Sequence, residues 1–186
     1  RDCNGVNLGN NATINWTGSC GSGSVTATNI SEIDITPICP GGASSCNNGG
    51  GAFGVEQHIY TATITLPPGC TNVTFSWGLC CRNNAITTLN GGGQRMYVET
   101  TLDNSVTPCN NSPVFTNTPT SFSCINNAVF YNHGAVDYDG DSLNFSLIPC
   151  LDNAGIPVNY LAGFSGAAPF GAVDAVSIDP GTGAIS

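Results

Sequence analysis

The chain has 186 residues and a formal net charge of −9, with three arginines and no lysine. So few cations exclude the basic surface that binding to nucleic acid or to an anionic membrane requires. The sequence contains no apolar run of about 18 residues that could span a bilayer. Its 40% hydrophobic content argues against intrinsic disorder.

Apolar and polar residues alternate along several short segments, which is the pattern of half-buried antiparallel strands. In chain order, this pattern predicts strands at residues 12–16, 33–35, 60–66, 73–79, 96–98, 129–131 and 143–147. Clusters of glycine, proline and asparagine predict turns at residues 21–23, 40–42, 47–51 and 90–93. No segment has the period of a helix. We therefore predict an all-β protein of two disulfide-stapled β-sandwich domains with almost no helix.

The composition changes near residue 110, where the sequence Asn-Asn-Ser-Pro at 110–113 is typical of a linker. We therefore expect a Cys-rich β-sandwich domain over residues 1–110 and a second β domain over residues 111–186.

Ten cysteines in a small chain indicate a disulfide framework and an oxidising compartment outside the cytoplasm. Zinc is the alternative, but the paired C-x2-4-C spacing of zinc sites is absent. Two pairs are expected: Cys124 with Cys150, the only two cysteines beyond residue 110, and Cys39 with Cys46, which bracket a short loop. The remaining six allow fifteen connectivities and stay unassigned: Cys3, Cys20, Cys70, Cys80, Cys81 and Cys109.

The adjacent cysteines Cys80 and Cys81 admit two interpretations. In a strand, neighbouring side chains point to opposite faces, so we expect these two to bond different partners. A vicinal ring between them is the alternative.

Six Asn-x-Ser/Thr sequons permit N-glycosylation in a suitable host without showing that it occurs. They begin at Asn11, Asn15, Asn29, Asn72, Asn110 and Asn144. No signal peptide precedes Arg1, so we expect a processed chain.

The order of motifs over residues 111–186 resembles the bacterial cadherin-like and Ig-like repeat family. The matching motifs are an opening Pro-Val-Phe at 113–115, an Asp-Tyr-Asp-Gly-Asp-Ser-Leu turn at 137–143 and a closing Asp-Pro-Gly-Thr-Gly-Ala-Ile-Ser at 179–186. The family pattern continues with one or two more strands, so the resemblance implies that this domain lacks its last strand. Residues 1–110, with Cys-Cys-Arg-Asn-Asn-Ala-Ile at 80–86, resemble the Cys-rich regions of large secreted surface adhesins of the Bacteroidota.

Asp137, Asp139 and Asp141 have the spacing of a ligand set, because alternate side chains of a turn can converge. Clustered carboxylates repel one another unless a cation binds, and hard oxygen ligands suit Ca2+. The resemblance also implies calcium, because the family often binds it at this turn. We therefore expect Ca2+ at these three carboxylates; Asp152 and Asp179 are candidates to complete the site, which the sequence does not show. The alternative is a solvated acidic turn.

No catalytic constellation stands out. We expect His58 and His133 to form hydrogen bonds or to lie at strand ends, not to act as ligands or bases. A Gly-x-Ser-x-Gly motif for a nucleophilic serine is absent. Glu56 and Glu99 are the carboxylates that a glycosidase pair would need, but nothing else in the sequence supports them. We therefore expect no enzyme.

The expected function is that of an extracellular structural or adhesive module of a large bacterial surface protein or filament. Its expected partners are other copies of itself in a filament, or the rest of a longer chain. The alternative is a carbohydrate-binding or accessory domain of a secreted hydrolase, with surface glycans as partners. An aromatic platform on one sheet face would favour that alternative, whereas contacts through sheet edges would favour the structural function.

Overall fold

The computed structural model describes residues 1–39, 41–47, 53–84, 86–90, 93–106, 109–119, 123–124, 127–171 and 175–186. Throughout these ranges the chain forms strands and turns without any helix, so the predicted all-β class is confirmed. No helix long and apolar enough to cross a membrane occurs in the same ranges.

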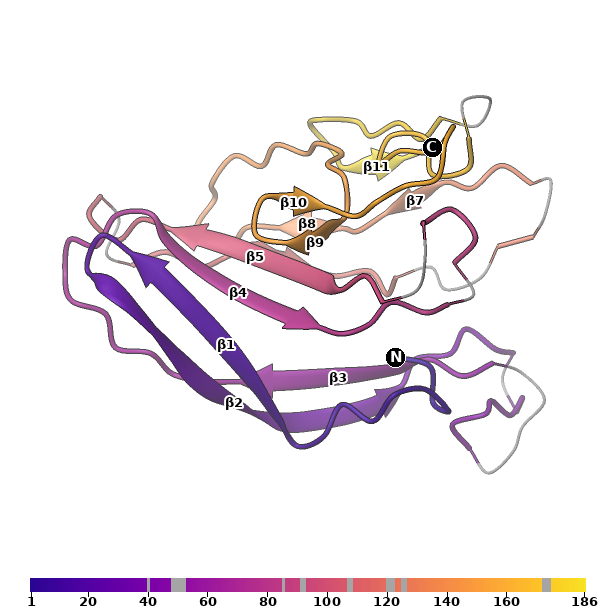
Figure 1. The fold of residues 1–186 in the computed structure, drawn as a ribbon, viewed down its shortest axis with the longest axis horizontal. Coiled ribbons are helices and arrows are strands. Elements are labelled where there is room, and N and C mark those ends of the chain that lie inside the picture. The colour runs from indigo at the N-terminus through magenta and orange to yellow at the C-terminus, as the bar shows by residue number, and fades with distance from the viewer. Residues whose placement is uncertain are drawn as a thin grey trace.

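One antiparallel sheet of seven strands, in the order β10-β9-β5-β4-β1-β2-β3, dominates the fold (Figure 1). In chain order the strands are β1 (Asn11–Gly18), β2 (Gly21–Asp34), β3 (Glu56–Thr61), β4 (Val73–Leu79), β5 (Met96–Leu102), β9 (Leu151–Asn153) and β10 (Ile156–Pro157). The predicted strands at 12–16, 73–79 and 96–98 are therefore confirmed.

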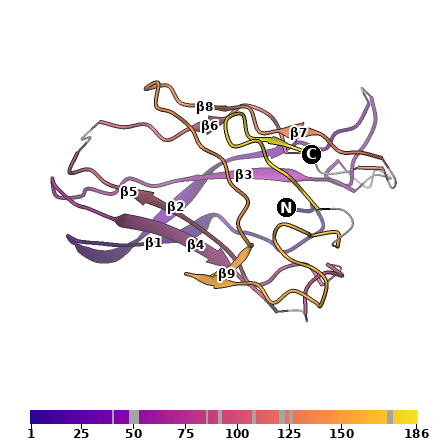
Figure 2. The same cartoon turned by 90° about the horizontal axis from the view of Figure 1, so that it is seen from above.

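Two small ladders accompany the large sheet: β6 (Val114–Phe115) with β8 (Ala135–Val136), and β7 (Tyr131–Asn132) with β11 (Ala184–Ile185). Figure 1 places β7, β8 and β11 beyond β5, on the side away from β2 and β3. Figure 2 shows β6, β8 and β7 along one side of the molecule and β9 on the opposite side.

The predicted boundary near residue 110 does not separate two sheets. Strands β9 and β10 follow residue 110 in the sequence, yet β9 pairs with β5 through Leu151 and Tyr97 and so extends the large sheet. The division into two sandwich domains stays a prediction.

Strands β1 and β2 form a tight hairpin in which Gly18 pairs with Gly21. The turn predicted at 21–23 is therefore wrong, because these residues already belong to β2. Gly23 lies opposite Trp16, and a Cβ atom at position 23 would lie only 2.9 Å from Nε1 of the Trp16 indole. The glycine thus makes room for an aromatic ring across the ladder, instead of marking a turn.

Two other predicted strands differ in the structure. The strand predicted at 60–66 begins earlier, at Glu56, and ends at Thr61. Residues 143–147 form no strand, although Leu143, Phe145 and Leu147 are half-buried and the residues between them are exposed. Alternation of side chains sets the two faces, but a strand also needs a backbone neighbour at hydrogen-bonding distance.

The core is small. Among the described residues, the buried apolar side chains are Ala27, Cys70, Val73 and Val158. Val73 packs against Gly18, where a Cβ atom would lie 2.9 Å from its Cγ2. Of these four residues, Val73 is the first of β4 and Cys70 lies in the segment just before it, next to the end of β1.

Candidate functional site

Six of the ten cysteines form three disulfides in the structure: Cys3–Cys46, Cys20–Cys70 and Cys80–Cys81. The first two have Cα–Cα distances of 5.1 and 5.4 Å, the usual separation for a disulfide. The bonds indicate folding in an oxidising environment outside the cytoplasm. The other four cysteines are exposed thiols: Cys39, Cys109, Cys124 and Cys150.

The expected Cys39–Cys46 pair is wrong, because Cys46 bonds Cys3. The N-terminal segment lies beside the start of β3, where the amide of Cys3 donates to the carbonyl oxygen of Gly54 (3.2 Å). A Cβ atom at position 54 would lie 2.6 Å from Sγ of Cys3, so the glycine leaves the space that the disulfide fills.

Two other disulfide expectations also differ. Cys124 and Cys150 are not joined: Cys150 immediately precedes β9 of the large sheet, whereas Cys124 precedes β7 of a small ladder. Cys80 and Cys81 bond each other instead of different partners. β4 ends at Leu79, so the alternation that would turn neighbouring side chains to opposite faces no longer applies to them.

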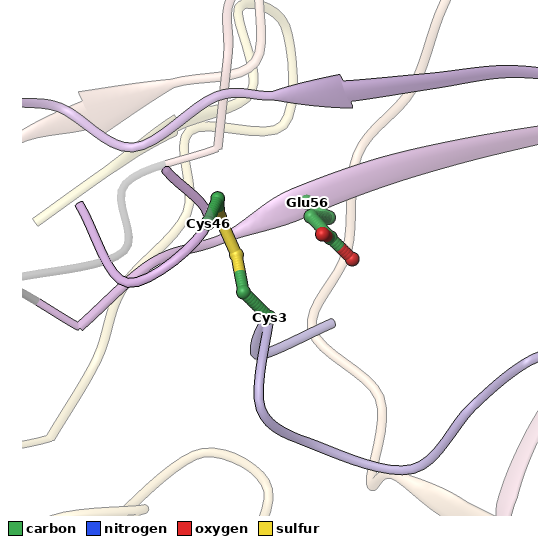
Figure 3. A group of neighbouring side chains, drawn as sticks. All are labelled: Cys3, Cys46 and Glu56. Atoms are coloured by element: carbon green, nitrogen blue, oxygen red, sulfur yellow. A yellow bond between two sulfur atoms is a disulfide. The ribbon is translucent and has the colours of Figure 1, made fainter. Parts of the chain in front are cut away.

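A polar cluster lies next to the Cys3–Cys46 disulfide, as Figure 3 shows for Glu56. Oε2 of Glu56 accepts hydrogen bonds from Nε of Arg1 (2.7 Å) and pairs with Nε2 of His58 (3.2 Å). Nδ1 of His58 lies 3.5 Å from Oε2 of Glu32. The side chains of His58 and Glu56 are only 5% and 13% exposed. Burial raises the pKa of Glu56, but hydrogen bonds from Arg1 and His58 outweigh this effect and leave the pKa below its ordinary value.

This polar cluster contains ligand-type side chains that lie close together. One ligand atom each from Glu32, Glu56 and His58 lies within 4.8 Å of the other two, although the two carboxylates contact different nitrogens of the His58 ring. The Arg1 guanidinium already supplies a cation to Glu56. The sulfurs of Cys3 and Cys46 are bonded to each other and offer no thiolate. The cluster instead fastens the N-terminal segment to β3, and His58 forms hydrogen bonds as expected.

The structure does not gather Asp137, Asp139 and Asp141 into a shared ligand set. Oδ1 of Asp137 accepts the backbone N–H groups of Asp139 (2.8 Å) and Asp141 (3.2 Å). Asp139 turns away to Asn111, whose amide Nδ2 donates to it at 2.9 Å, and the hydrogen bonds from Asn111 lower the pKa of Asp139. Calcium binding at this turn stays a prediction.

The two carboxylates named as further calcium ligands are engaged elsewhere. Asp152 accepts a hydrogen bond from the backbone N–H of Arg95. Oδ1 of Asp179 accepts hydrogen bonds from the backbone N–H groups of Gly181 (2.9 Å) and Thr182 (2.7 Å). His133 packs between aromatic rings, with centroids 4.8 Å from Tyr131 and 5.2 Å from Phe115.

Five of the six sequon asparagines are exposed: Asn11, Asn15, Asn72, Asn110 and Asn144. Asn29 is half-buried, and its Nδ2 lies 3.3 Å from Nδ1 of His58 while its Oδ1 accepts the N–H of Ser31. A glycan on Asn29 would break the contact with His58, so the other five are the accessible acceptors.

A groove of about 910 Å³ lies over β1, β4 and β5, and we call it the β1–β4–β5 groove. Its floor contains one row of facing residues, in which Asn15 pairs with Ser76 and Ser76 with Glu99. Tyr97 and Arg95 also line it. The sequence predicted polar outer faces for these strands. It did not predict which strands lie next to one another, because strand order depends on long-range pairing that the alternation of residues does not encode.

The two carboxylates considered as a glycosidase pair are far apart in the sheet. Glu56 lies on β3 and Glu99 on β5, with β1, β2 and β4 between them, and the strand registers turn the two side chains to opposite faces. This arrangement does not permit the facing carboxylates that glycoside hydrolysis requires. No family model, curated protein or solved structure matches this chain.

Proposed function

We propose that this chain is a non-enzymatic extracellular structural or adhesive module that covers its exposed apolar surface by binding further copies of itself. The observation that carries the proposal is the size of its surface. The chain exposes 12054 Å², whereas a folded monomer of 19.0 kDa exposes roughly 8,400 Å². The excess is about 3,700 Å² for one chain, which is more than the roughly 1,000–2,500 Å² that each partner contributes to an obligate interface of about 2,000–5,000 Å² in total.

The exposed surface is rich in large apolar side chains. Four phenylalanines are mostly exposed: Phe53 (75%), Phe115 (63%), Phe130 (79%) and Phe170 (72%). Monomeric proteins seldom leave so much large apolar surface in water, and such surface is typical of proteins that bind other proteins. Single exposed apolar residues would need no explanation. The excess surface area and the small core, however, also favour a surface that binds other proteins.

The charge content supports association between like copies. Only 8% of the residues are charged, and there is no lysine, the residue that most often blocks pairing at sheet edges. The net charge of −9 opposes association, so bridging cations would favour it. The oxidising environment indicated by the disulfides and the resemblance of residues 111–186 to cadherin-like repeats support a place at the cell surface.

Electron microscopy of the native material, with and without calcium, tests this proposal. Repeating fibres or regular oligomers built from a 19.0 kDa chain are expected. A native protein of much larger mass would instead mean that neighbouring domains of one long chain cover the apolar surface. Dispersed single particles of the 19.0 kDa chain under both conditions would contradict the proposal.

A further inference from the structure

We infer that the β1–β4–β5 groove is a binding site for a neutral oligosaccharide. This binding activity goes beyond the structural function proposed above and does not depend on it. The groove volume of about 910 Å³ lies within the range of about 300–1,000 Å³ that is usual for small-molecule sites.

The floor of the groove offers hydrogen-bonding groups in regular order. Asn15, Ser76 and Glu99 face one another on three adjacent strands, and Thr17 and Thr74 form the next row. Neighbouring strands lie about 4.8 Å apart, so these amide, hydroxyl and carboxylate groups form a grid of donors and acceptors. Sugar hydroxyl groups both donate and accept hydrogen bonds, and a grid of this kind can pair with several of them at once.

Tyr97 supplies an aromatic surface beside this grid. It lies opposite Gly78 on β4, and a Cβ atom at position 78 would lie 3.6 Å from Cδ2 of the Tyr97 ring. The Tyr97 hydroxyl donates to Oε2 of Glu99 at 2.8 Å, which fixes the ring. Burial and this hydrogen bond raise the pKa of Tyr97, so the hydroxyl stays a donor at neutral pH. An aromatic side chain with one polar end is suited to stacking on the apolar face of a sugar ring.

The charges around the groove select for a neutral ligand. Among the described lining residues, Arg95 and Glu99 are the charged ones, and they carry opposite charges. The chain as a whole carries −9, which would repel an anionic polysaccharide. The floor row of Asn15, Ser76 and Glu99 is polar, whereas Leu8, Trp77 and Leu79 also line the groove.

Two sequon residues, Asn11 and Asn15, line the same groove. A glycan attached at Asn15 would therefore fill the site with the chain's own sugar. The experiment must use protein from a host without N-glycosylation, and the glycosylated protein then serves as a second sample in which binding from solution is expected to be blocked.

The test is an amide NMR titration of the unglycosylated chain with soluble oligomers of glucose, mannose, galactose and N-acetylglucosamine, and with an oligomer of galacturonic acid as the anionic comparison. At least one neutral oligomer is expected to shift the resonances of Asn15, Ser76 and Tyr97, and the anionic oligomer is not. Tyr97→Ala is expected to weaken binding about tenfold, and Tyr97→Phe, which keeps the ring, by less.

The matched control is Tyr138→Ala, which removes an aromatic side chain that is 73% exposed and does not line the groove. It is expected to bind as the unaltered chain does. Near-UV circular dichroism shows whether each variant is folded, and Tyr97→Phe keeps the test decisive if Tyr97→Ala does not fold. The inference is overturned if no neutral oligomer shifts these resonances, if the shifts map outside the groove, or if the folded Tyr97 variants bind with unchanged affinity.

Discussion

The carboxylate of Glu56 is the most connected acidic group of the polar cluster. It pairs with Arg1 and His58, and the backbone of Glu56 also exchanges hydrogen bonds with Arg1, at 2.7 and 2.8 Å. Because its side chain is only 13% exposed, these contacts are screened less than a surface ion pair. Glu56 therefore couples the N-terminal segment to the edge strand β3.

Glu56→Gln is expected to reduce the free energy of unfolding at pH 7 by about 1–2 kcal/mol, because it removes the negative charge to which Arg1 and His58 hydrogen-bond. A carboxylate whose folded pKa is lowered stabilises the fold above its unfolded pKa, and this contribution is lost as the pH falls through the lowered folded pKa. The unaltered chain should therefore lose stability more steeply below about pH 5 than Glu56→Gln does.

Urea unfolding at a series of pH values measures this difference. Asp141→Asn, a change in the exposed acidic turn, is the matched control and should keep the acid slope of the unaltered chain. Equal slopes for the Glu56 variant and the unaltered chain would show that the Glu56 contacts do not stabilise the fold.

At the scale of elements, the β1–β2 hairpin depends on the contact of Trp16 with Gly23. The indole occupies the position that any side chain at residue 23 would need, with Cε2 at 3.2 Å and Nε1 at 2.9 Å from a Cβ atom there. Trp16 also pairs with Phe75 on β4, so a displaced indole would disturb the centre of the large sheet.

Gly23→Val is expected to destabilise the fold by about 1–3 kcal/mol, because the added side chain must push the indole aside. Valine has a higher β-propensity than glycine, so propensity alone would predict that Gly23→Val stabilises the fold. Thermal unfolding followed by tryptophan fluorescence measures the effect. Ser22→Val, at a neighbouring exposed position of β2, is the control and should be neutral or stabilising. A Gly23→Val chain as stable as the unaltered one would contradict this account of the hairpin.

Alternation predicted β1 and β4 because each is long enough to repeat the pattern several times, whereas the strand at β5 was predicted from Met96 and Val98 alone. Alternation did not predict β9 and β10, which have three and two residues; they pair with each other, and β9 also pairs with the distant strand β5. It predicted a strand at 143–147, where the faces alternate but no ladder forms. The sequence predicts a turn at Gly23 because it does not show that Trp16 lies opposite this residue. The β1–β4–β5 groove could not be predicted for the same reason, since Asn15, Ser76 and Glu99 meet only in the folded sheet.

At the scale of the whole molecule, the three disulfides all lie in the first half of the chain, before Arg82. Beyond Arg1, the arginines of the chain are Arg82 and Arg95, and there is no lysine. Trypsin therefore separates the six bonded cysteines from the exposed thiols of Cys109, Cys124 and Cys150.

Tryptic digestion without reductant is expected to release residues 2–82 and 96–186 as separate peptides. Mass spectrometry after alkylation of free thiols should find the peptide 96–186 alkylated at three positions, those of Cys109, Cys124 and Cys150. A disulfide that links the two peptides, or a bond between Cys124 and Cys150, would contradict the pairing seen in the structure.

The small core, the exposed phenylalanines and the excess surface together describe a chain that needs a partner surface. The central claim is that further copies of the chain supply it. The most direct test is the molar mass in solution, measured by sedimentation velocity over a wide range of protein concentration with calcium present. We expect species at multiples of 19.0 kDa whose share grows with concentration. A single 19.0 kDa species at every concentration would contradict the claim.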